Sequence, residues 1–447
     1  MSKYKPYTKY KDSGIEWLGE IPEGWEAKKL KYISTVNDDV LPDSTSGEEE
    51  IKYIDIGSVT TGYILNYEHM LYSNAPSRAK RIIKTGDILV STVRTYLKAI
   101  APVSSEYDNY IASTGFAVIR SNKELNSTFT EYALLSNYFV DLVESHSVGV
   151  SYPAINSSNI MTFNIALPPL QEQKTIDNYL DKTTVKIDNL IEKQTRLIAL
   201  LKEKRQAVIS TAVTRGLDSS VPMKESGVEW LGEIPVGWKT PKLKLFITTT
   251  KGFAFKSDDF IEEGIPVVKM SEIKNGTINK SSVFLPKTFQ FTHKQVLLRY
   301  KDIIVSTVGS APEVKNSAVG QIGIVPREHD GSLLNQNTVV YSPNKTLLSN
   351  NYLPYVLNSQ AYREHLDIYA HGTANQASLN LVDMLKFVFP SPSLKEQEKI
   401  ANYLDDKTQK IDNLITKATK AIDLLKERRT ALISAVVTGK VDVRGGV

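Results

Sequence analysis

The feature that most constrains the fold is a long helical pattern that occurs twice, at 170–218 and at 394–442. The two copies keep one register without insertion and share several motifs: Leu-Gln-Glu-Gln (170–173) with Leu-Lys-Glu-Gln (394–397), and Ile-Asp-Asn-Leu-Ile (187–191) with the same five residues at 411–415. No proline or glycine interrupts either pattern before Gly216 and Gly439, which lie where the patterns end. About forty residues that rise 1.5 Å each predict two helices roughly 60 Å long.

The apolar residues of both patterns recur at heptad spacing, which is typical of helices that pack along a seam. The rows of the first copy are Leu180, Ile187, Leu201 and Val208, with Leu190 and Leu197 beside them. Gln194 interrupts the seam, as polar residues that fix the register of a coiled coil do. Duplication at this length favours two long helices paired as an antiparallel coiled coil, although two ordinary amphipathic helices of a bundle would show the same heptads.

Composition places the chain among globular proteins of two or three domains, because 447 residues exceed what one core usually holds. Hydrophobic residues make up 41% and charged residues 23%, and no apolar run approaches the roughly 18 residues of a membrane span. The absence of cysteine excludes disulfides and thiol nucleophiles, and together with the polar N-terminus it predicts a cytoplasmic protein without a membrane partner. A net charge of only +4 means that any nucleic-acid binding must come from local patches.

A second repeat opens each half of the chain, at 13–25 and at 226–238, and eleven of its thirteen positions are identical. It contains all four tryptophans of the chain, Trp17, Trp25, Trp230 and Trp238. The glycine and proline residues predict a non-helical loop, and its repetition favours tryptophans that anchor protein partners at two equivalent sites. A buried structural corner would explain the same residues equally well.

Each loop motif is followed by a variable region, 36–167 or 249–389, that we predict to be mixed α/β. Three segments match between the halves: Gly-Asp-Ile-Leu-Val-Ser (86–91) with Lys-Asp-Ile-Ile-Val-Ser (301–306), Phe-Ala-Val-Ile (116–119) with Asn-Thr-Val-Val (337–340), and Ala-Ile-Asn-Ser (154–157) with Ser-Leu-Asn-Leu (378–381). Between them the halves diverge. Two domains that share a scaffold but differ in their loops should bind two versions of one class of ligand, and a bipartite, asymmetric site on duplex DNA fits that design.

The whole chain resembles the DNA-specificity subunits of type I restriction-modification enzymes. The motifs that carry the resemblance are the two Trp-Leu-Gly-Glu-Ile-Pro segments, Pro-Leu-Gln-Glu-Gln at 169–173 with Ser-Leu-Lys-Glu-Gln at 393–397, and Gly-Asp-Ile-Leu-Val-Ser at 86–91. The resemblance implies two target-recognition domains that each read half of a split site, helices that set the gap, and recruitment of two methylation subunits, with restriction subunits added for cleavage. Lys301, where the first half has Gly86, puts only the local turn type in doubt.

Together these observations predict an α+β fold, in which two mixed α/β target-recognition domains are joined and separated by two long antiparallel coiled-coil helices. The internal repeat predicts pseudo-twofold symmetry. The expected boundaries are 1–168 for the first recognition domain, 169–217 for the first helix, 218–391 for the second recognition domain, and 392–447 for the second helix with the C-terminal tail.

The sequence carries no motif for catalysis that withstands inspection. A methyltransferase needs an Asn/Asp-Pro-Pro-aromatic loop and a motor needs Gly-x4-Gly-Lys-Ser/Thr, and neither occurs. We therefore expect a non-catalytic subunit without cofactors or metals of its own, with S-adenosylmethionine, ATP and Mg²⁺ on the partner subunits. Two rival hypotheses stay open: a metal-dependent nuclease that uses Asp43, Glu50 and Lys52, and a coiled-coil adaptor that binds only proteins. We interpret Glu172 and Glu396, at the helix starts, as dipole and cap partners.

Candidate DNA contacts are basic, aromatic and short polar residues of the variable regions. Basic side chains suit phosphates, Arg94 also suits guanine, and the amides of the second half suit adenine. The set comprises Arg78, Lys80, Arg81, Arg94, Tyr96, Lys98, Ser113, Thr114, Tyr152 and Asn156 in the first half, and Lys251, Lys256, Lys287, Lys315, Gln336, Asn337, Asn375 and Gln376 in the second. For each residue, a solvated surface position or a capped turn is an equally good interpretation.

Overall fold

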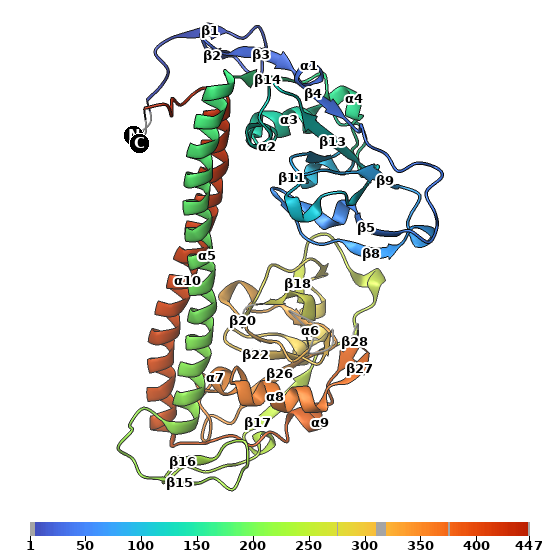
Figure 1. The fold of residues 1–447 in the computed structure, drawn as a ribbon. Helices are drawn as coiled ribbons and strands as arrows, with labels where there is room; N and C mark the ends of the chain where they lie inside the picture. Colours follow the sequence, from blue (N-terminus) through green and yellow to red (C-terminus); the bar gives the residue numbers. More distant parts are fainter. Residues whose placement is uncertain (1–4, 275, 310–318, 374–375, 446–447) are drawn as a thin grey trace. The chain divides into compact units, whose positions relative to one another are not determined.

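The two helical patterns form two long helices, α5 (Leu170–Arg215) and α10 (Leu394–Val437) (Figure 1). The structure, a computed structural model, describes residues 5–274, 276–309, 319–373 and 376–445. The chain divides into two units: unit 1 comprises 1–195 with 419–447, and unit 2 comprises 196–418. Each unit therefore contains half of each helix and one mixed α/β region. We call these regions α/β domain 1 (5–168) and α/β domain 2 (218–391).

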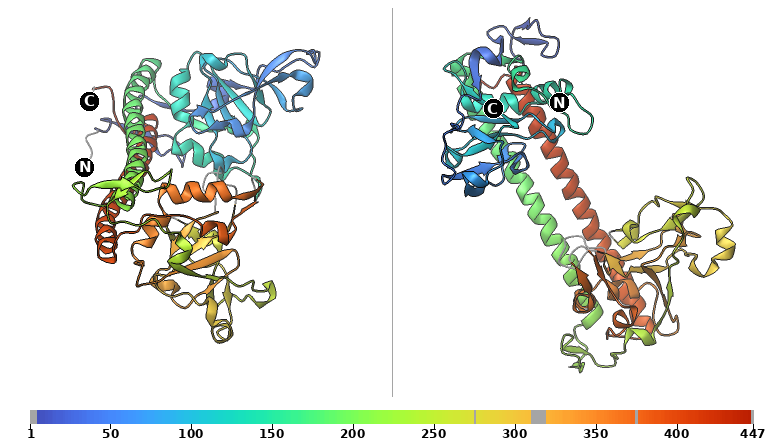
Figure 2. Two further views of the ribbon diagram at one scale, coloured as in Figure 1. Left: turned by 90° about the horizontal axis from the view of Figure 1, so that it is seen from below. Right: turned by 90° about the vertical axis from the view of Figure 1, so that its right-hand side faces the viewer.

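Within each unit the two helix halves lie side by side and run antiparallel (Figures 1 and 2). In unit 1 the Arg429 guanidinium donates to Asp188 at 2.9 Å, and in unit 2 Arg205 donates to Asp412 at the same distance. The two ion pairs join equivalent positions of the duplicated sequence, so both units keep one helix register.

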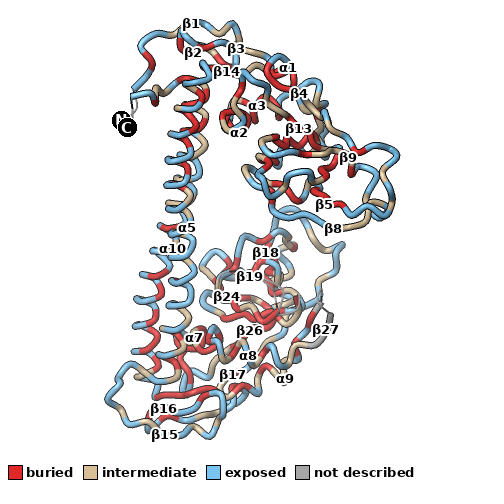
Figure 3. Tube along the Cα trace, viewed as in Figure 1, coloured by how far each residue is buried: buried red, intermediate tan, exposed pale blue. Residues whose placement is uncertain are grey.

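The buried seam of the helix pair is narrower than the heptads alone predict. Leu180, Ile187 and Leu201 are buried, as their row predicts. Leu190 and Leu197, from the neighbouring row, remain 46% and 43% exposed, so this row is only partly covered. Exposed residues dominate the middle of both helices, whereas buried residues concentrate near the ends, where the α/β domains pack (Figure 3).

α/β domain 1 is built on two four-stranded sheets. The first has the order β11 (Ile100–Pro102), β10 (Ile88–Ser91), β13 (Phe116–Ser121) and β4 (Ser34–Val36), all antiparallel. The second has the order β8 (Glu68–Leu71), β5 (Glu50–Ile54), β12 (Ile111–Ser113) and β9 (Ala79–Ile82), with β5 and β12 parallel. Smaller elements are β1 (Tyr10–Asp12) with β2 (Glu20–Pro22), β3 (Glu26–Lys29) with β14 (Asn164–Leu167), β6 (Val59–Thr60) with β7 (Tyr63–Ile64), α1 (Leu30–Ile33) and α4 (Ser157–Ile160).

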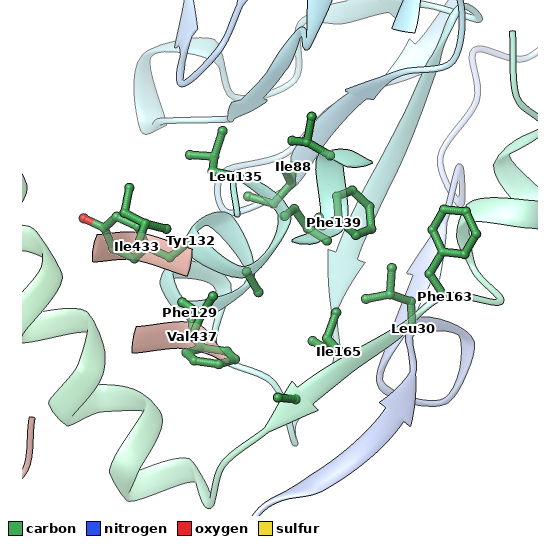
Figure 4. Close-up of a cluster of buried hydrophobic side chains, with 14 of the residues drawn as sticks. Leu30, Ile88, Phe129, Tyr132, Leu135, Phe139, Phe163, Ile165, Ile433 and Val437 are labelled. Atoms are coloured by element: carbon green, nitrogen blue, oxygen red, sulfur yellow. The ribbon is translucent and has the colours of Figure 1, made fainter. Parts of the chain in front are cut away.

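Two helices join this domain to its part of the helix pair. They are α2 (Ser127–Leu134) and α3 (Asn137–Ser145). Phe129 and Phe139 enter one core with Ile88 from the first sheet and with Ile433 and Val437 from α10 (Figure 4). The long helix thus forms one wall of the domain core.

α/β domain 2 repeats this plan with a larger sheet. Its six-stranded sheet has the order β17 (Ile247–Lys251), β26 (Thr338–Pro343), β22 (Ile303–Ser306), β24 (Ile322–Ile324), β20 (Gly276–Ile278) and β19 (Ile273–Lys274). Two three-stranded sheets are β21 (Phe284–Leu285), β18 (Ile265–Val268) and β25 (Leu333–Leu334), and β23 (Val308–Gly309), β28 (Gln376–Ser378) and β27 (His371–Thr373). The remaining elements are β15 (Met223–Glu225), β16 (Glu233–Pro235), α6 (Phe289–Thr292), α7 (Leu353–Leu357), α8 (Gln360–Tyr369) and α9 (Leu381–Met384).

The framework strands match between the domains, with one correction. β10 and β22 are the predicted equivalent buried strands. Gly86 and Lys301 both adopt positive φ, at +89° and +70°, so the turn is kept although the residue differs. In the partner strands Leu89 pairs with Val118 and Ile304 pairs with Val340, so Val118 is equivalent to Val340. The predicted match of 116–119 with 337–340 is therefore wrong by one residue. A one-residue slip in a strand exchanges its two faces.

A buried glutamine explains the Glu-Gln motif at each helix start. Gln173 accepts from the backbone N–H of Asn126 at 2.8 Å and donates to the carbonyls of Glu124 and Pro168, both at 2.9 Å. Gln397 repeats all three bonds: its amide oxygen accepts from the Ser349 N–H at 2.8 Å, and its nitrogen donates to the carbonyls of Leu347 and Pro392 at 3.0 Å. Both glutamines are fully buried. We call this arrangement the glutamine clamp.

Two of the four repeated tryptophans lie in the core, which corrects their prediction as partner-binding anchors. Trp25 is 1% exposed and packs edge-on against Tyr7, with 5.6 Å between ring centroids. Trp238 is 3% exposed, and its indole N–H donates to Glu396 at 3.1 Å. A Cβ on Gly216, whose φ is +76°, would lie 3.2 Å from the Trp238 ring. The motif is therefore partly the buried corner that was the alternative interpretation.

The other two tryptophans remain accessible. Trp17 is 63% exposed, and Trp230 is 44% exposed with its ring stacked on Phe387 at 5.4 Å.

Glu172, at the start of α5, bonds the N-terminal segment, because its carboxylate accepts from the Tyr7 hydroxyl at 2.7 Å. Its role is thus to hold the N-terminal segment, beyond the predicted role at the helix start.

Unit 1 also buries an acidic pair that unit 2 lacks. Asp177 on α5 is 7% exposed, and one of its carboxylate oxygens has no hydrogen-bond partner in the described structure. Burial raises the pKa of Asp177 to about 7 and that of Glu131 on α2 to about 7, and the nearby Asp181 carboxylate adds to both shifts. The equivalent positions of unit 2 hold Ala401 and Pro354.

Removing the glutamine clamp should destabilise unit 1. Gln173→Leu leaves one buried N–H and two carbonyls unbonded, so we expect the free energy of unfolding to fall by about 3 kcal/mol or more. Chemical denaturation of the purified chain measures this loss. Gln171→Leu, on the exposed face of the same helical turn, is the matched control and should change little. Equal stability of the two variants would refute the assigned role of the clamp.

Asp177→Asn should stabilise the chain in a pH-dependent way. Because the folded state raises the pKa of Asp177, folding retains a proton that the unfolded chain loses, and stability falls as pH rises from about 4 to about 7. Asn removes this penalty, so we expect a gain on the order of a few kcal/mol at pH 8 and none at pH 4. Thermal unfolding at both pH values checks the gain, with Asp141→Asn, an exposed acid of α3, as the control. A variant no more stable than the wild type at pH 8 would contradict it.

Candidate nucleic-acid interface

Three segments of α/β domain 1 that lie far apart in the sequence meet at one edge. The Thr92 N–H donates to the carbonyl of Gly115 at 2.8 Å, and the Ile155 N–H donates to the carbonyl of Thr92 at 2.9 Å. The Thr114 N–H donates to the carbonyl of Arg78 at 2.8 Å. We call the segments 92–98, 113–115 and 147–156 the loop edge of domain 1.

α/β domain 2 builds the same edge from the equivalent segments. The Thr307 N–H donates to the carbonyl of Asn337 at 2.8 Å, and the Leu379 N–H donates to the carbonyl of Thr307 at 2.8 Å. The loop edge of domain 2 thus comprises 307–309, 335–337 and 376–380. The backbone is shared, whereas the side chains differ between the edges.

The strongest candidate in the loop edge of domain 1 is the pair Arg94 and Tyr152. The Arg94 guanidinium lies over the Tyr152 ring at 5.0 Å, and the Arg94 N–H donates to the carbonyl of Pro153 at 2.7 Å. Both side chains are exposed, and Arg94 forms no ion pair within the described parts of the chain. A guanidinium held by an aromatic ring rather than by a carboxylate stays available to a phosphate or a guanine.

The neighbouring candidates Tyr96 and Lys98 belong to the same loop. Tyr96 is 53% exposed, and Lys98 forms an ion pair with Glu144 at 3.7 Å. Arg94 and Lys98 both adopt φ of +51°, which costs energy for residues with a Cβ. Left-handed backbone at two positions four residues apart is a local strain of the sort that concentrates at functional loops.

The three basic residues of the segment 78–81 differ in exposure and in hydrogen-bond partners: Arg78, Lys80 and Arg81. Arg78 is exposed beside the loop edge. The Lys80 ammonium donates to the Tyr72 hydroxyl at 2.8 Å and to Asp43 at 3.3 Å. These two hydrogen bonds, first that to Tyr72 and then that to Asp43, raise the pKa of Lys80. Arg81 is partly buried, its Nε has no hydrogen-bond partner in the described structure, and burial lowers its pKa.

Ser113, Thr114 and Asn156 separate into one buried and two exposed residues. Ser113 is fully buried, which corrects its prediction as a direct DNA contact, because its strand turns the side chain into the domain. Thr114 and Asn156 are exposed. Asn156 precedes α4 without a side-chain capping bond, whereas the equivalent Asn380 caps α9 by accepting from the Val382 N–H at 3.0 Å.

In domain 2 the structure brings together Lys251, Gln336 and Asn337. The Gln336 N–H donates to the carbonyl of Phe253 at 2.9 Å, which places the end of β17 beside the loop edge. Gln336 and Asn337 are exposed, and Asn337 has φ of +67°. Lys251, Lys256 and Lys287 are exposed. Lys315 and Asn375 lie outside the described residues, and for Gln376 only the backbone, in β28, is described.

The residues of the rival nuclease hypothesis each bond a different group. Asp43 pairs with Lys80, the Glu50 carboxylate lies 3.3 Å from His69, and the Lys52 ammonium donates to the Tyr110 hydroxyl at 3.1 Å. Among the described residues, no group of three or more His, Asp or Glu side chains is arranged to hold a metal ion. Within the same residues no helix is both long and apolar enough to cross a membrane.

Sequence reasoning missed the hairpin that carries Tyr152. Val148 and Ala154 exchange two backbone hydrogen bonds, and the residues between them form the turn of the hairpin. The only signal in the sequence is Gly149 followed closely by Pro153, which indicates a turn but not what the turn exposes.

Comparisons with known proteins agree with this architecture. The family described as type I restriction modification DNA specificity domain matches residues 22–200 and 235–423. Similar relatives include the MjaVIII specificity subunit of Methanocaldococcus jannaschii, 26% identical over 75% of each chain, and the EcoKI specificity subunit of Escherichia coli, 19% identical over 95% of this chain and 90% of the relative.

Two solved structures show the same fold. One, titled as the structural basis of complex assembly and conformational transition of the type I R-M system, has a TM-score of 0.73 and 21% identity over 94% of this chain and 99% of that chain. The HsdS subunit from Thermoanaerobacter tengcongensis has a TM-score of 0.51 and 22% identity over 94% and 98% of the two chains. Because the family matches in both halves and covers most of the sequence, this chain belongs to the type I restriction-modification DNA specificity family.

Proposed function

We propose that this chain is the DNA-reading subunit of a type I restriction-modification complex, in which each α/β domain reads one half of a bipartite, asymmetric site in duplex DNA. The observation that carries the proposal is the pair of loop edges, which share backbone hydrogen bonds but present different side chains. If both loop edges carried the same side chains, they would read a symmetric site. Because their side chains differ, they read different bases.

The side chains of the edges suit the grooves of DNA. Domain 1 offers the Arg94 guanidinium, which can bond guanine at two atoms. Domain 2 offers the Gln336 and Asn337 amides, which can bond adenine in the same way, and Lys251 nearby suits a phosphate. Because one domain would read guanine and the other adenine, the target is asymmetric.

The helix pair is proposed to set the gap between the half-sites. The equivalent ion pairs Asp188–Arg429 and Arg205–Asp412 support one pseudo-twofold register along an antiparallel coiled coil. A stiff pair of helices transmits a fixed length, because each residue adds 1.5 Å and bending a paired helix breaks its seam.

Partner subunits are proposed to dock on surfaces that the repeat presents twice. Each unit exposes one tryptophan of the repeat, Trp17 in unit 1 and Trp230 in unit 2. Each unit also exposes an equivalent leucine pair on its helices: Leu190 with Leu424 in unit 1, and Leu414 with Leu200 in unit 2. Two equivalent surfaces fit two copies of a methylation subunit. That subunit would supply S-adenosylmethionine, and restriction subunits would supply ATP and Mg²⁺, so that this chain is non-catalytic.

The proposal is tested by reconstituting the chain with its methylation subunits and mapping the methylated adenines in plasmid DNA. One asymmetric split sequence is the expected result. Cleavage of DNA by the isolated chain with a divalent metal would favour the nuclease hypothesis. Assembly with partners but without any sequence-specific retention of DNA would favour the protein-binding adaptor.

Lengthening the helix pair should widen the gap without changing the bases read. Four residues inserted after Gln194, with four more after the equivalent Ala418 to keep both helices matched, add about 6 Å of helix. At about 3.4 Å per base pair we expect the gap to grow by one or two pairs. Mapping of methylated sites measures both the gap and the half-sites.

Exchanging residues 249–389 for the corresponding region of a relative is the complementary control. It should change one half-site and leave the gap alone. An insertion that altered the bases recognised, or an exchange that altered both half-sites together, would contradict the division of roles between helices and domains.

Trp17→Ala should weaken partner binding without changing the methylated sequence. The side chain is mostly exposed, so its loss costs little stability but removes a large aromatic contact from an interface. Pull-down of the methylation subunit measures the effect, and Tyr63→Ala, a 55% exposed aromatic of domain 1, is the matched control. Trp25→Ala should instead unfold unit 1, because that ring is buried. A shifted methylation sequence with Trp17→Ala would show that the assignment is wrong.

A further inference from the structure

The hairpin of the domain 1 loop edge has an apolar tip whose side chains are exposed in the described part of unit 1. Val150 is fully exposed at 101%, Val148 is 80% exposed and Tyr152 is 68% exposed. Loops are usually polar where they face water, and a single exposed apolar residue would need no explanation. Here three alternate residues of one hairpin are exposed, next to the half-exposed Tyr96 and Leu97 of the adjoining loop.

The tip is held in place by hydrogen bonds at its base, although its side chains are exposed. Val148 and Ala154 exchange hydrogen bonds of 2.9 and 3.0 Å, and the Thr95 hydroxyl donates to that of Ser147 at 2.8 Å. Gly149 has φ of +113°, and a Cβ there would lie 3.1 Å from the Tyr152 carbonyl. The hairpin is therefore pinned at its base and shaped by a glycine, so its apolar residues are presented with little further loss of conformational entropy on binding.

A cation, the Arg94 guanidinium, lies beside this tip. Arg94 lies against Tyr152, two residues from Val150, and it forms no ion pair within the described structure. An apolar wedge next to a free guanidinium is the combination with which proteins enter DNA between bases while holding the adjacent backbone. A protein partner would need its own acidic residue to satisfy Arg94, whereas DNA supplies a phosphate at every step.

We propose that the hairpin tip, with Val150 at its apex, is an apolar wedge that contacts bases of the half-site read by domain 1. The inference rests on the proposed function and adds the contact through which domain 1 grips its half-site. Burial of one valine side chain accounts for roughly a tenfold gain in affinity for DNA that fits the tip. Because the contact is apolar, it adds no phosphate neutralisation and does not change the salt dependence of binding.

The test compares Val150→Ser with Val150→Ile in the reconstituted complex with methylation subunits. The DNA probes are its mapped target duplex and an unrelated duplex. We expect Val150→Ser to weaken binding to the target about tenfold, with unchanged binding to the unrelated duplex and an unchanged slope of affinity against salt. Val150→Ile should retain wild-type affinity. With the wild-type complex, base substitutions in the domain 1 half-site should change the affinity for DNA. With Val150→Ser, the substitution at the position that the tip contacts should no longer change it.

The matched control is Ile368→Ser, a 74% exposed apolar residue of α8 in domain 2, which should bind the target as the wild type does. The melting temperature of Val150→Ser should equal that of the wild type, because the Val150 side chain is fully exposed. An equal melting temperature shows that a loss of affinity does not come from unfolding.

Three results would overturn the inference: wild-type affinity of Val150→Ser for the target, an equal loss on both duplexes, or loss of assembly with the methylation subunits, which would make the tip a protein contact. If the wild-type complex bound the target duplex no more tightly than the unrelated duplex, the proposed function itself would be refuted.

Discussion

The antiparallel pairing of α5 with α10 is the constraint on which the rest of the structure depends. Each helix is long enough to belong to both units, so the same two segments close two separate cores. The ion pairs Asp188–Arg429 and Arg205–Asp412 fix one register, and any slip of the helices would break both at once. The α/β domains add their helices and sheets to walls that this pairing already provides.

The sequence predicted the parts of the fold that repeat. Heptads without glycine or proline foretold both helices, and the duplicated Asp-Ile-aliphatic-Val-Ser segments foretold β10 and β22. It failed where the outcome depends on what packs on top. Leu190 and Leu197 follow the heptad but stay half exposed, and Trp25 and Trp17 come from one motif yet only Trp25 is buried. Local pattern sets the periodicity of a segment, whereas burial is decided by segments far away in the chain.

The candidate site was predictable in part for the same reason. Arg94 and Tyr152 were both named as candidates, but nothing in the sequence shows that they touch, since their loops meet through backbone contacts between segments about sixty residues apart, such as the pairing of Val93 with Ala154. Ser113 is the buried last residue of β12, whereas the adjacent Thr114 is exposed because it lies in the turn that follows the strand. The exposed tip at Val150 was not predictable, because a glycine and a proline indicate a turn but not which of its side chains are exposed.

The glutamine clamp reaches its domain through main-chain atoms alone. Gln173 bonds the backbone of residues 124 and 126, and Gln397 bonds that of residues 347 and 349. The helix consequently does not depend on which side chains the attached domain carries at these positions, provided that one N–H and one carbonyl are presented there. A domain of different sequence that presents the same two main-chain groups would therefore keep the clamp, so the clamp tolerates sequence change at these positions of the domain without any change in the helix.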